Sequence, residues 1–266
     1  MIGSLGRMWA IAVNTFREAI RNKVLYGIGV MALVLIVVAV AIGNMSLHEE
    51  ARVARDVSVA GVSFFGMITA VYLGVSMLYN EMQKKTIHTI LAKPIERHEF
   101  VLGKYVGMAI TLTILTVLFA LALIGQLKFQ QAELTPAIVK AIVLSYCEVL
   151  VVAAVAVFFS SFSSPFLSGI FTVLIWLIGR WTDELSDAAA RASIRAFRVI
   201  CAVALRLVPD MHLFSLSGGE LDGKHVSVHG SFVTWGYVAQ SAAYAVTWIM
   251  VLLLLAALIF RRRDFV

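Results

Sequence analysis

Long apolar runs alternate with short polar connectors along the chain, and six of these runs are candidates to cross a membrane. A hydrocarbon core of about 30 Å requires about 20 residues of helix. The predicted spans are Val24–Gly43, Val59–Tyr79, Val101–Leu127, Ala137–Ser160, Phe166–Gly179 and Trp235–Phe260. The fifth run is short for such a core, which indicates a broken or tilted element. The pattern predicts an all-α polytopic membrane protein, with residues 1–266 forming a single transmembrane domain.

The N-terminal residues 4–21 form an amphipathic segment that precedes the first span. Its apolar positions recur at helical spacing, and they are Leu5, Trp9, Ala12, Phe16 and Ile20. A basic helix with aromatic residues on its apolar face is typical of the membrane interface, so this segment is predicted to be an interfacial helix. The run from Val24 to Gly43 is too long for the core of a signal peptide, so we expect it to be an uncleaved span.

The connector between the second and third spans, Asn80–Lys104, is the most charge-dense part of the first half of the chain. Its first half carries apolar residues that can share one helical face, namely Met82, Ile87, Ile90 and Leu91. Pro94 ends this helix because proline removes an amide donor and restricts the residue before it. Proline also suits the first turn of a new helix. A short amphipathic helix within residues 81–100 is therefore predicted between two spans.

The same connector carries a pattern that resembles a known family. The residues in question are Glu81, Thr86, Leu91, Pro94, Arg97, Gly103 and Lys104. They are similar to the ABC type-2 permeases, the membrane subunits of one class of ATP-binding cassette transporters. The ending from Phe260 to Phe265 resembles that family as well, and the resemblance extends over essentially the whole chain.

This resemblance implies a transmembrane permease subunit that couples ATP hydrolysis by a partner ATPase to substrate movement, in the direction of export. Residues 4–21 would then be the family's elbow helix, and residues 81–100 its coupling helix. The positions expected to contact the ATPase are Glu81, Met82, Thr86, Ile87, Ile90, Leu91, Pro94 and Arg97. Two ATPase copies, which hold ATP and Mg, and a second permease, identical or different, are the implied partners. The alternative is an ordinary basic loop that docks on nothing.

Cations flank the first span, the second-to-third connector and the last span, and with six spans all of them fall on one side. They include Arg7, Arg17, Arg21, Lys23, Lys84, Lys85, Lys93, Arg97, Lys104, Arg261, Arg262 and Arg263. The positive-inside rule makes this side cytoplasmic, so both termini are expected in the cytoplasm and the protein in the bacterial inner membrane. The net charge of +6 therefore reflects orientation in the membrane, and no nucleic-acid partner is expected.

Composition agrees with the pattern, because 61% of residues are hydrophobic and only 14% are charged, which excludes an ordinary soluble domain. The two cysteines give no disulfide framework. Small residues four positions apart mark sites of close helix packing, within the subunit or across a dimer. These are Gly66, Ala70 and Gly74 in the second span and Gly103 and Gly107 in the third.

The segment Arg180–Thr234, between the fifth and sixth spans, is predicted to lie outside the membrane core. Asp183 can cap a helix that continues to Leu207. Four arginines fall within an arc of roughly 80° on this external amphipathic helix, at Arg191, Arg195, Arg198 and Arg206. We expect this arginine stripe to face lipid phosphates, although water would also satisfy it. A turn at Asp222-Gly223 and a short strand from His225 follow.

Glu148 is the one carboxylate deep inside a predicted span, which makes it a candidate functional residue. It could instead be a packed glutamate near Ser145 or Tyr146. An alternative function is a secondary transporter that uses Glu148 as its proton carrier. His225 and His229 could hold a metal with Glu220 or Asp222, but a polar hairpin is commoner and no metal site is predicted.

No phosphate-binding loop accompanies these features, since Gly103-Lys104 lacks both the upstream glycine and the following Ser or Thr. Nor does the sequence contain a nucleophile elbow or an HExxH motif. We therefore expect a non-catalytic membrane subunit that binds no cofactor itself, with ATP hydrolysis on another polypeptide.

Overall fold

The protein is described here by a computed structural model. It describes residues 3–43, 50–83, 96–130, 135–192, 194–215, 219–221, 224–226 and 233–262. Its helices are α1 (Ser4–Ile20), α2 (Lys23–Gly43), α3 (Glu50–Gln83), α5 (Arg97–Phe129), α6 (Pro136–Ser160), α7 (Pro165–Arg180), α8 (Thr182–Arg191), α9 (Arg195–Leu207) and α10 (Trp235–Arg262), with a 3₁₀ turn η1 (His212–Phe214). Two short strands are also present among the described residues, β1 (Gly219–Leu221) and β2 (Lys224–Val226).

The predicted all-α polytopic fold is confirmed. Five of the described helices are long and apolar enough to cross a membrane, and the bent pair α7 and α8 gives a sixth crossing if it counts as one span. The fifth predicted span corresponds to α7, which has 16 residues and is therefore about 24 Å long. That length is below the roughly 30 Å of a hydrocarbon core. A 70° bend separates α7 from α8, so of the two alternatives that the sequence indicated, a broken or a tilted element, the structure has the broken one.

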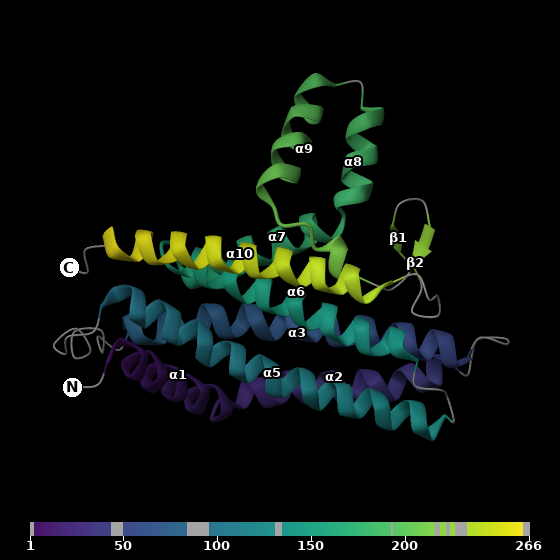
Figure 1. Cartoon of the computed structure of the whole chain (residues 1–266), viewed down its shortest axis with the longest axis horizontal. Coiled ribbons are helices and arrows are strands. Elements are labelled where there is room, and N and C mark those ends of the chain that lie inside the picture. The colour runs from purple at the N-terminus through teal and green to yellow at the C-terminus, as the bar shows by residue number, and fades with distance from the viewer. Residues whose placement is uncertain are drawn as a thin grey trace.

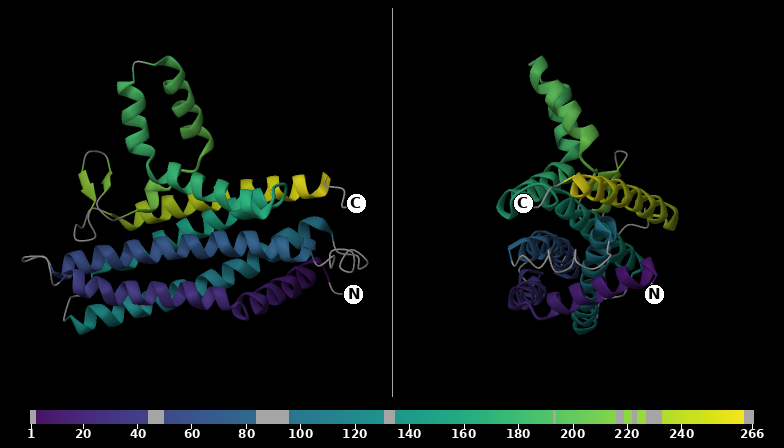
Figure 2. Two further views of the ribbon diagram at one scale, coloured as in Figure 1. Left: turned by 180° about the vertical axis from the view of Figure 1, so that it is seen from behind. Right: turned by 90° about the vertical axis from the view of Figure 1, so that its left-hand side faces the viewer.

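The long helices lie side by side along one axis, and α6 runs through the middle of the bundle (Figure 1). It packs against α3, α5, α7 and α10. Its residues are apolar all round the helix, which suits a helix that is buried on several sides. Helix α1 begins and α10 ends at the same end of the bundle, here called the terminal end, and the β1–β2 hairpin lies toward the opposite end (Figures 1 and 2).

Helices α3 and α6 approach closely along a row of small residues. A Cβ added at Gly66 would lie 2.6 Å from Val149 Cγ2, and one added at Gly74 would overlap Ala156 on the same helix. Ala70, between the two glycines, is fully buried. The structure thus places this small-residue row at a helix contact inside the subunit.

The other two glycines of interest, Gly103 and Gly107 on α5, face the backbone of α1. A Cβ at Gly103 would lie 2.9 Å from the Met8 carbonyl oxygen, and one at Gly107 would lie 2.5 Å from that of Ala12. Helix α1 packs along α5 at this contact. The glycines therefore allow the N-terminal helix to lie directly on the backbone of the third span.

The single external helix predicted from Asp183 to Leu207 is wrong, because the chain folds it into two helices, α8 and α9. Ala192 has an extended backbone, with φ −72° and ψ 131°, and so ends α8. The chain then turns back and the two helices pack against each other as a hairpin that stands away from the bundle (Figures 1 and 2). Each helix gains a packed face in this way, whereas one long helix would expose its whole length.

Strands β1 and β2 pair antiparallel, with Glu220 opposite His225. They flank the predicted Asp222-Gly223 turn, and β2 matches the start of the predicted strand.

Candidate functional site

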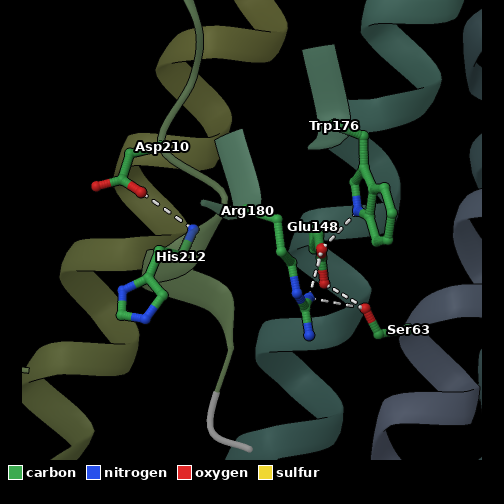
Figure 3. A network of polar contacts seen from close by, with 6 residues as sticks. All are labelled: Ser63, Glu148, Trp176, Arg180, Asp210 and His212. Atoms are coloured by element: carbon green, nitrogen blue, oxygen red, sulfur yellow. Dashed lines mark hydrogen bonds and ion pairs between the residues drawn. The ribbon is translucent and has the colours of Figure 1, made fainter. Parts of the chain in front are cut away.

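Glu148, near the middle of α6, is the centre of a buried polar network. Its side chain is fully enclosed. Atom Oε2 accepts a hydrogen bond from Ser63 Oγ at 2.5 Å, and Oε1 accepts bonds from Trp176 Nε1 and Arg180 Nη1, both at 2.8 Å (Figure 3). The Arg180 contact is an ion pair. An intramembrane carboxylate needs a partner for its charge, and Arg180 supplies it.

Three helices bring this network together. Ser63 comes from α3, Glu148 from α6, and Trp176 and Arg180 from α7. The two α7 residues are four apart and so lie on one face of that helix. The Arg180 guanidinium also lies 5.8 Å from the centre of the Trp176 ring, a cation–π distance. Because Arg180 is the last residue of α7, the ion pair fixes the end of α7 just before the chain bends.

The sequence drew attention to Glu148 but not to its partner, and it suggested Ser145 or Tyr146 as neighbours instead. Ser63, Trp176 and Arg180 are the residues that bond to it among those described. In the sequence, Arg180 is a cation at the end of an apolar run, and nothing near it in the chain points to Glu148. One signal was present, since charged residues within a membrane tend to pair and Arg180 closes a span too short to cross the core.

A second polar group lies on the other side of the bend. Asp210 Oδ1 accepts hydrogen bonds from Thr182 Oγ1 at 2.8 Å and from the His212 backbone amide at 3.0 Å (Figure 3 shows the latter). The Asp210 amide in turn donates to the Tyr244 hydroxyl on α10 at 2.8 Å. His212 Nδ1 lies 3.1 Å from Asp183 Oδ2. These contacts tie the start of α8 to α10 through the segment that follows α9.

The backbone reinforces the same corner. The Met211 amide donates to the Gly179 carbonyl at 2.8 Å, and a Cβ at Gly179 would lie 2.5 Å from the Pro209 carbonyl oxygen. Gly179 is therefore required for the close approach of this segment to α7. With the Glu148 network on one side and these contacts on the other, the α7–α8 corner is a fixed point in the structure.

We expect Glu148→Gln to reach the membrane at the wild-type level but to lower transport. The amide keeps an oxygen that can accept from Trp176 or Arg180, so packing is retained, whereas the charge that neutralises Arg180 is lost. Membrane expression and vesicle transport measure the two effects, and Ser145→Ala on the same helix is the control. Full expression together with full transport would show that Glu148 has no functional role.

At the terminal end, α1 and α5 are joined by a two-pronged ion pair. Arg7 Nε donates to Glu99 Oε2 at 2.9 Å and Arg7 Nη2 donates to Glu99 Oε1 at 2.7 Å. Glu99 is 1% exposed and belongs to a capping box with Glu96 in the first turn of α5. The hydrogen bond to Glu99 raises the pKa of the Arg7 guanidinium above its ordinary value. The ion pair and the glycine contacts together form what we call the α1–α5 clamp, made by Arg7, Glu99, Gly103 and Gly107.

The predicted ATPase-contacting residues lie between the end of α3 and the start of α5. Glu81 and Met82 are in the last turn of α3, and Arg97 is the first residue of α5. The others fall outside the described residues, and they are Thr86, Ile87, Ile90, Leu91 and Pro94. Both helix ends lie at the terminal end of the bundle (Figure 1). The amphipathic helix within residues 81–100 stays a prediction.

The four arginines predicted to form one stripe are divided between the two limbs of the α8–α9 hairpin. Arg191 is on α8, where it pairs with Asp187 at 3.2 Å. Arg195, Arg198 and Arg206 are on α9 and are exposed. These three keep a common arc, but Arg191 does not belong to it, because the helix that would have aligned all four is interrupted at Ala192.

The metal hypothesis gains no support from the described part of the chain. No group of three or more His, Cys, Asp or Glu residues there could hold a metal ion. Asp222 and His229 lie outside the described residues, so their part of the hypothesis is not tested.

The long apolar helices define a multi-pass membrane protein. An enclosed carboxylate paired with an arginine lies inside the bundle. The chain belongs to the ABC-2 family transporter proteins, because the model of that family matches residues 9–265. The resemblance noted in the sequence is thereby confirmed. No curated protein is similar enough to supply a closer relative.

Proposed function

We propose that this chain is the transmembrane permease subunit that couples ATP hydrolysis on a separate ATPase subunit to substrate export. The observation that carries the proposal is the α1–α5 clamp, which lies directly after the connector predicted to contact the ATPase. The family supports the permease class. The clamp supplies a physical route from the connector into the helices of the bundle.

The route depends on two pairs of closely packed helices. Helix α5 is bound to α1 by the clamp, and α3 is packed on α6 through Gly66 and Gly74. The connector joins the end of α3 to the start of α5, and therefore joins these two pairs. When an ATPase bound to the connector moves, closely packed helices respond by small rigid-body shifts rather than by bending. Displacing the connector would thus shift one pair relative to the other.

The remaining assignments follow from this role. The terminal end of the bundle would face the cytoplasm of a bacterium, with the spans in its inner membrane, since Arg7 near the start of α1, Arg97 at the start of α5 and Arg261 near the end of α10 lie there among the described cations. ATP and Mg would be bound by two ATPase subunits, and a second permease subunit would complete the transporter. This chain would contribute motion and a pathway rather than catalysis.

The Glu148 network disfavours the alternative of a secondary transporter with Glu148 as proton carrier. Both carboxylate oxygens already accept hydrogen bonds, and one is paired with Arg180. Each time Glu148 took up a proton, Arg180 would lose its compensating charge inside the bundle. We propose instead that the network is structural support for the transport cycle, holding α7 against α3 and α6.

Insertion of two glycines after Pro94 tests the route. We expect the ATPase to bind almost as before, because all of its predicted contact residues except Arg97 lie at or before Pro94. Most transport should be lost, because flexible glycines no longer pass motion to α5. Co-purification of the ATPase and vesicle transport are the two readouts. The control is the same insertion after Gln131, in the connector at the other end of α5. Equal loss of transport in both variants would contradict the proposed route.

A further inference from the structure

The α8–α9 hairpin is the least supported part of the described structure. It stands out sideways from the bundle, and the main helix contact of each limb is with the other limb (Figures 1 and 2). Most of its side chains are exposed on both limbs. Helices in proteins owe most of their stability to packing of an apolar face, so a hairpin of this kind needs a further surface to cover it.

Charge is distributed along the hairpin with opposite signs at its two ends. Three carboxylates lie in the first two turns of α8, at the root of the hairpin beside the bundle, and they are Asp183, Glu184 and Asp187. Three arginines lie around the tip where the chain turns back, and they are Arg191, Arg195 and Arg198. Helix α8 has 10 residues and is about 15 Å long. Within one hairpin, Asp187 of the root pairs with Arg191 of the tip, and Asp183 pairs with His212. Arg206 lies back toward the root.

An apolar face follows the same limb. Ile200, Val203 and Leu207 on α9 are 66%, 50% and 69% exposed. These positions are three or four residues apart and so line one side of α9, whereas Arg195 and Arg198 lie on its other side. The hairpin thus presents an exposed apolar strip together with an acidic and a basic end.

We propose that this hairpin pairs with the same hairpin of a second copy of the chain, the basic tip of each lying on the acidic root of the other. A two-fold axis makes every contact twice, and it requires a surface that is complementary to itself. An acidic root and a basic tip on one arm meet that requirement, and the apolar strips of the two arms cover each other. Anionic lipid headgroups would satisfy only the arginines and would repel the exposed carboxylates of the root.

The inference rests on the proposed function in one respect, since it identifies the second permease as an identical chain. The inference is tested by whether two copies lie close enough to form a disulfide bond, and not by transport activity. Two differently tagged copies of the chain are co-expressed with the native ATPase, and both carry Cys147→Ala and Cys201→Ala to remove the native cysteines. One copy carries Ser186→Cys near the root, and the other carries Ala196→Cys near the tip. Oxidised membranes are then scored for the disulfide-linked dimer. The control pair carries Ser186→Cys in both copies.

Two charge-reversed backgrounds make the test specific. The root variant carries Glu184→Arg and Asp187→Arg, and the tip variant carries Arg195→Glu and Arg198→Glu. Like charges facing each other are strongly unfavourable in an interface. We expect the root-to-tip dimer to form in the native charge background and the control pair to give none. It should fall at least about tenfold when both copies are root variants or both are tip variants. It should return when one copy is a root variant and the other a tip variant, because both junctions are then complementary again.

Three results would overturn the proposal. The first is the absence of a root-to-tip dimer in the native charge background, and the second is a yield that does not change with charge reversal. The third is loss of the dimer in the tip variant alone, with no recovery on mixing, which would indicate lipid as the ligand of the arginines. ATPase co-purification should remain unchanged in every case, so a failure here is distinguishable from a failure of the proposed function.

Discussion

Replacing Arg180 by alanine is expected to destabilise the protein by about 3–5 kcal/mol, because it leaves a buried carboxylate without its compensating charge. Glu148 is fully enclosed, and Arg180 is its ion-pair partner among the described residues. Ser63 and Trp176 would still donate hydrogen bonds to it, but neither neutralises the charge. The last residue of α7 would also lose its bonds to Glu148 and Ser63. The measurement is the thermal unfolding midpoint of the purified protein, together with its yield in membranes.

Two matched variants give this prediction its control. Arg180→Ala in the Glu148→Gln background should cost clearly less than Arg180→Ala alone, because no charge is then left unpaired. Arg191→Ala removes an arginine from an exposed pair with Asp187 and should change stability by at most about 1 kcal/mol. If Arg180→Ala were as mild as Arg191→Ala, the Glu148 network would not be a support of the fold.

The spans could be predicted from the sequence because their signal is local. A run of about 20 apolar residues is enough to define a membrane helix, whatever it packs against. Positions of close packing were visible for the same reason, since glycines four apart allow backbones to approach. Their partners were not visible. That Gly66 meets Val149 on α6 and Gly107 meets α1 depends on which helices become neighbours in the bundle.

The partner of Glu148 and the break in the external segment could not be predicted, and the reasons differ. Arg180 is 32 residues from Glu148 in the chain, and only the packing of α7 on α6 brings the two together. The break at Ala192 lies in a stretch without proline or glycine, so helical periodicity continues through it. There the packing of α8 on α9 outweighs a local preference for one continuous helix.

Leu91→Glu and Ile87→Glu are expected to abolish coupling to the ATPase. Both residues lie on the predicted apolar face of the segment within residues 81–100, which is outside the described part of the structure. An apolar anchor in a groove of a partner contributes about 2 kcal/mol or more, and a carboxylate in the same groove adds a desolvation penalty. The helices of the bundle should fold as before, because the sequence places both positions in the connector and outside the predicted spans. Either release of the ATPase or hydrolysis without transport would fit this account.

Lys84→Ala is the matched control, since Lys84 belongs to the polar rim of the same segment. Rim charges mainly alter the rate of encounter and its salt dependence, so this variant should bind the ATPase almost as well as the wild type.

The most direct test of the coupling role is to co-purify the ATPase with each of these variants and to measure ATP-driven transport in vesicles made from the same membranes. The account predicts that the Lys84→Ala protein retains both the ATPase and transport, and that Leu91→Glu and Ile87→Glu lose transport while the permease itself remains folded in the membrane. An ATPase that co-purifies equally well with both glutamate variants and drives transport at the wild-type rate would contradict it.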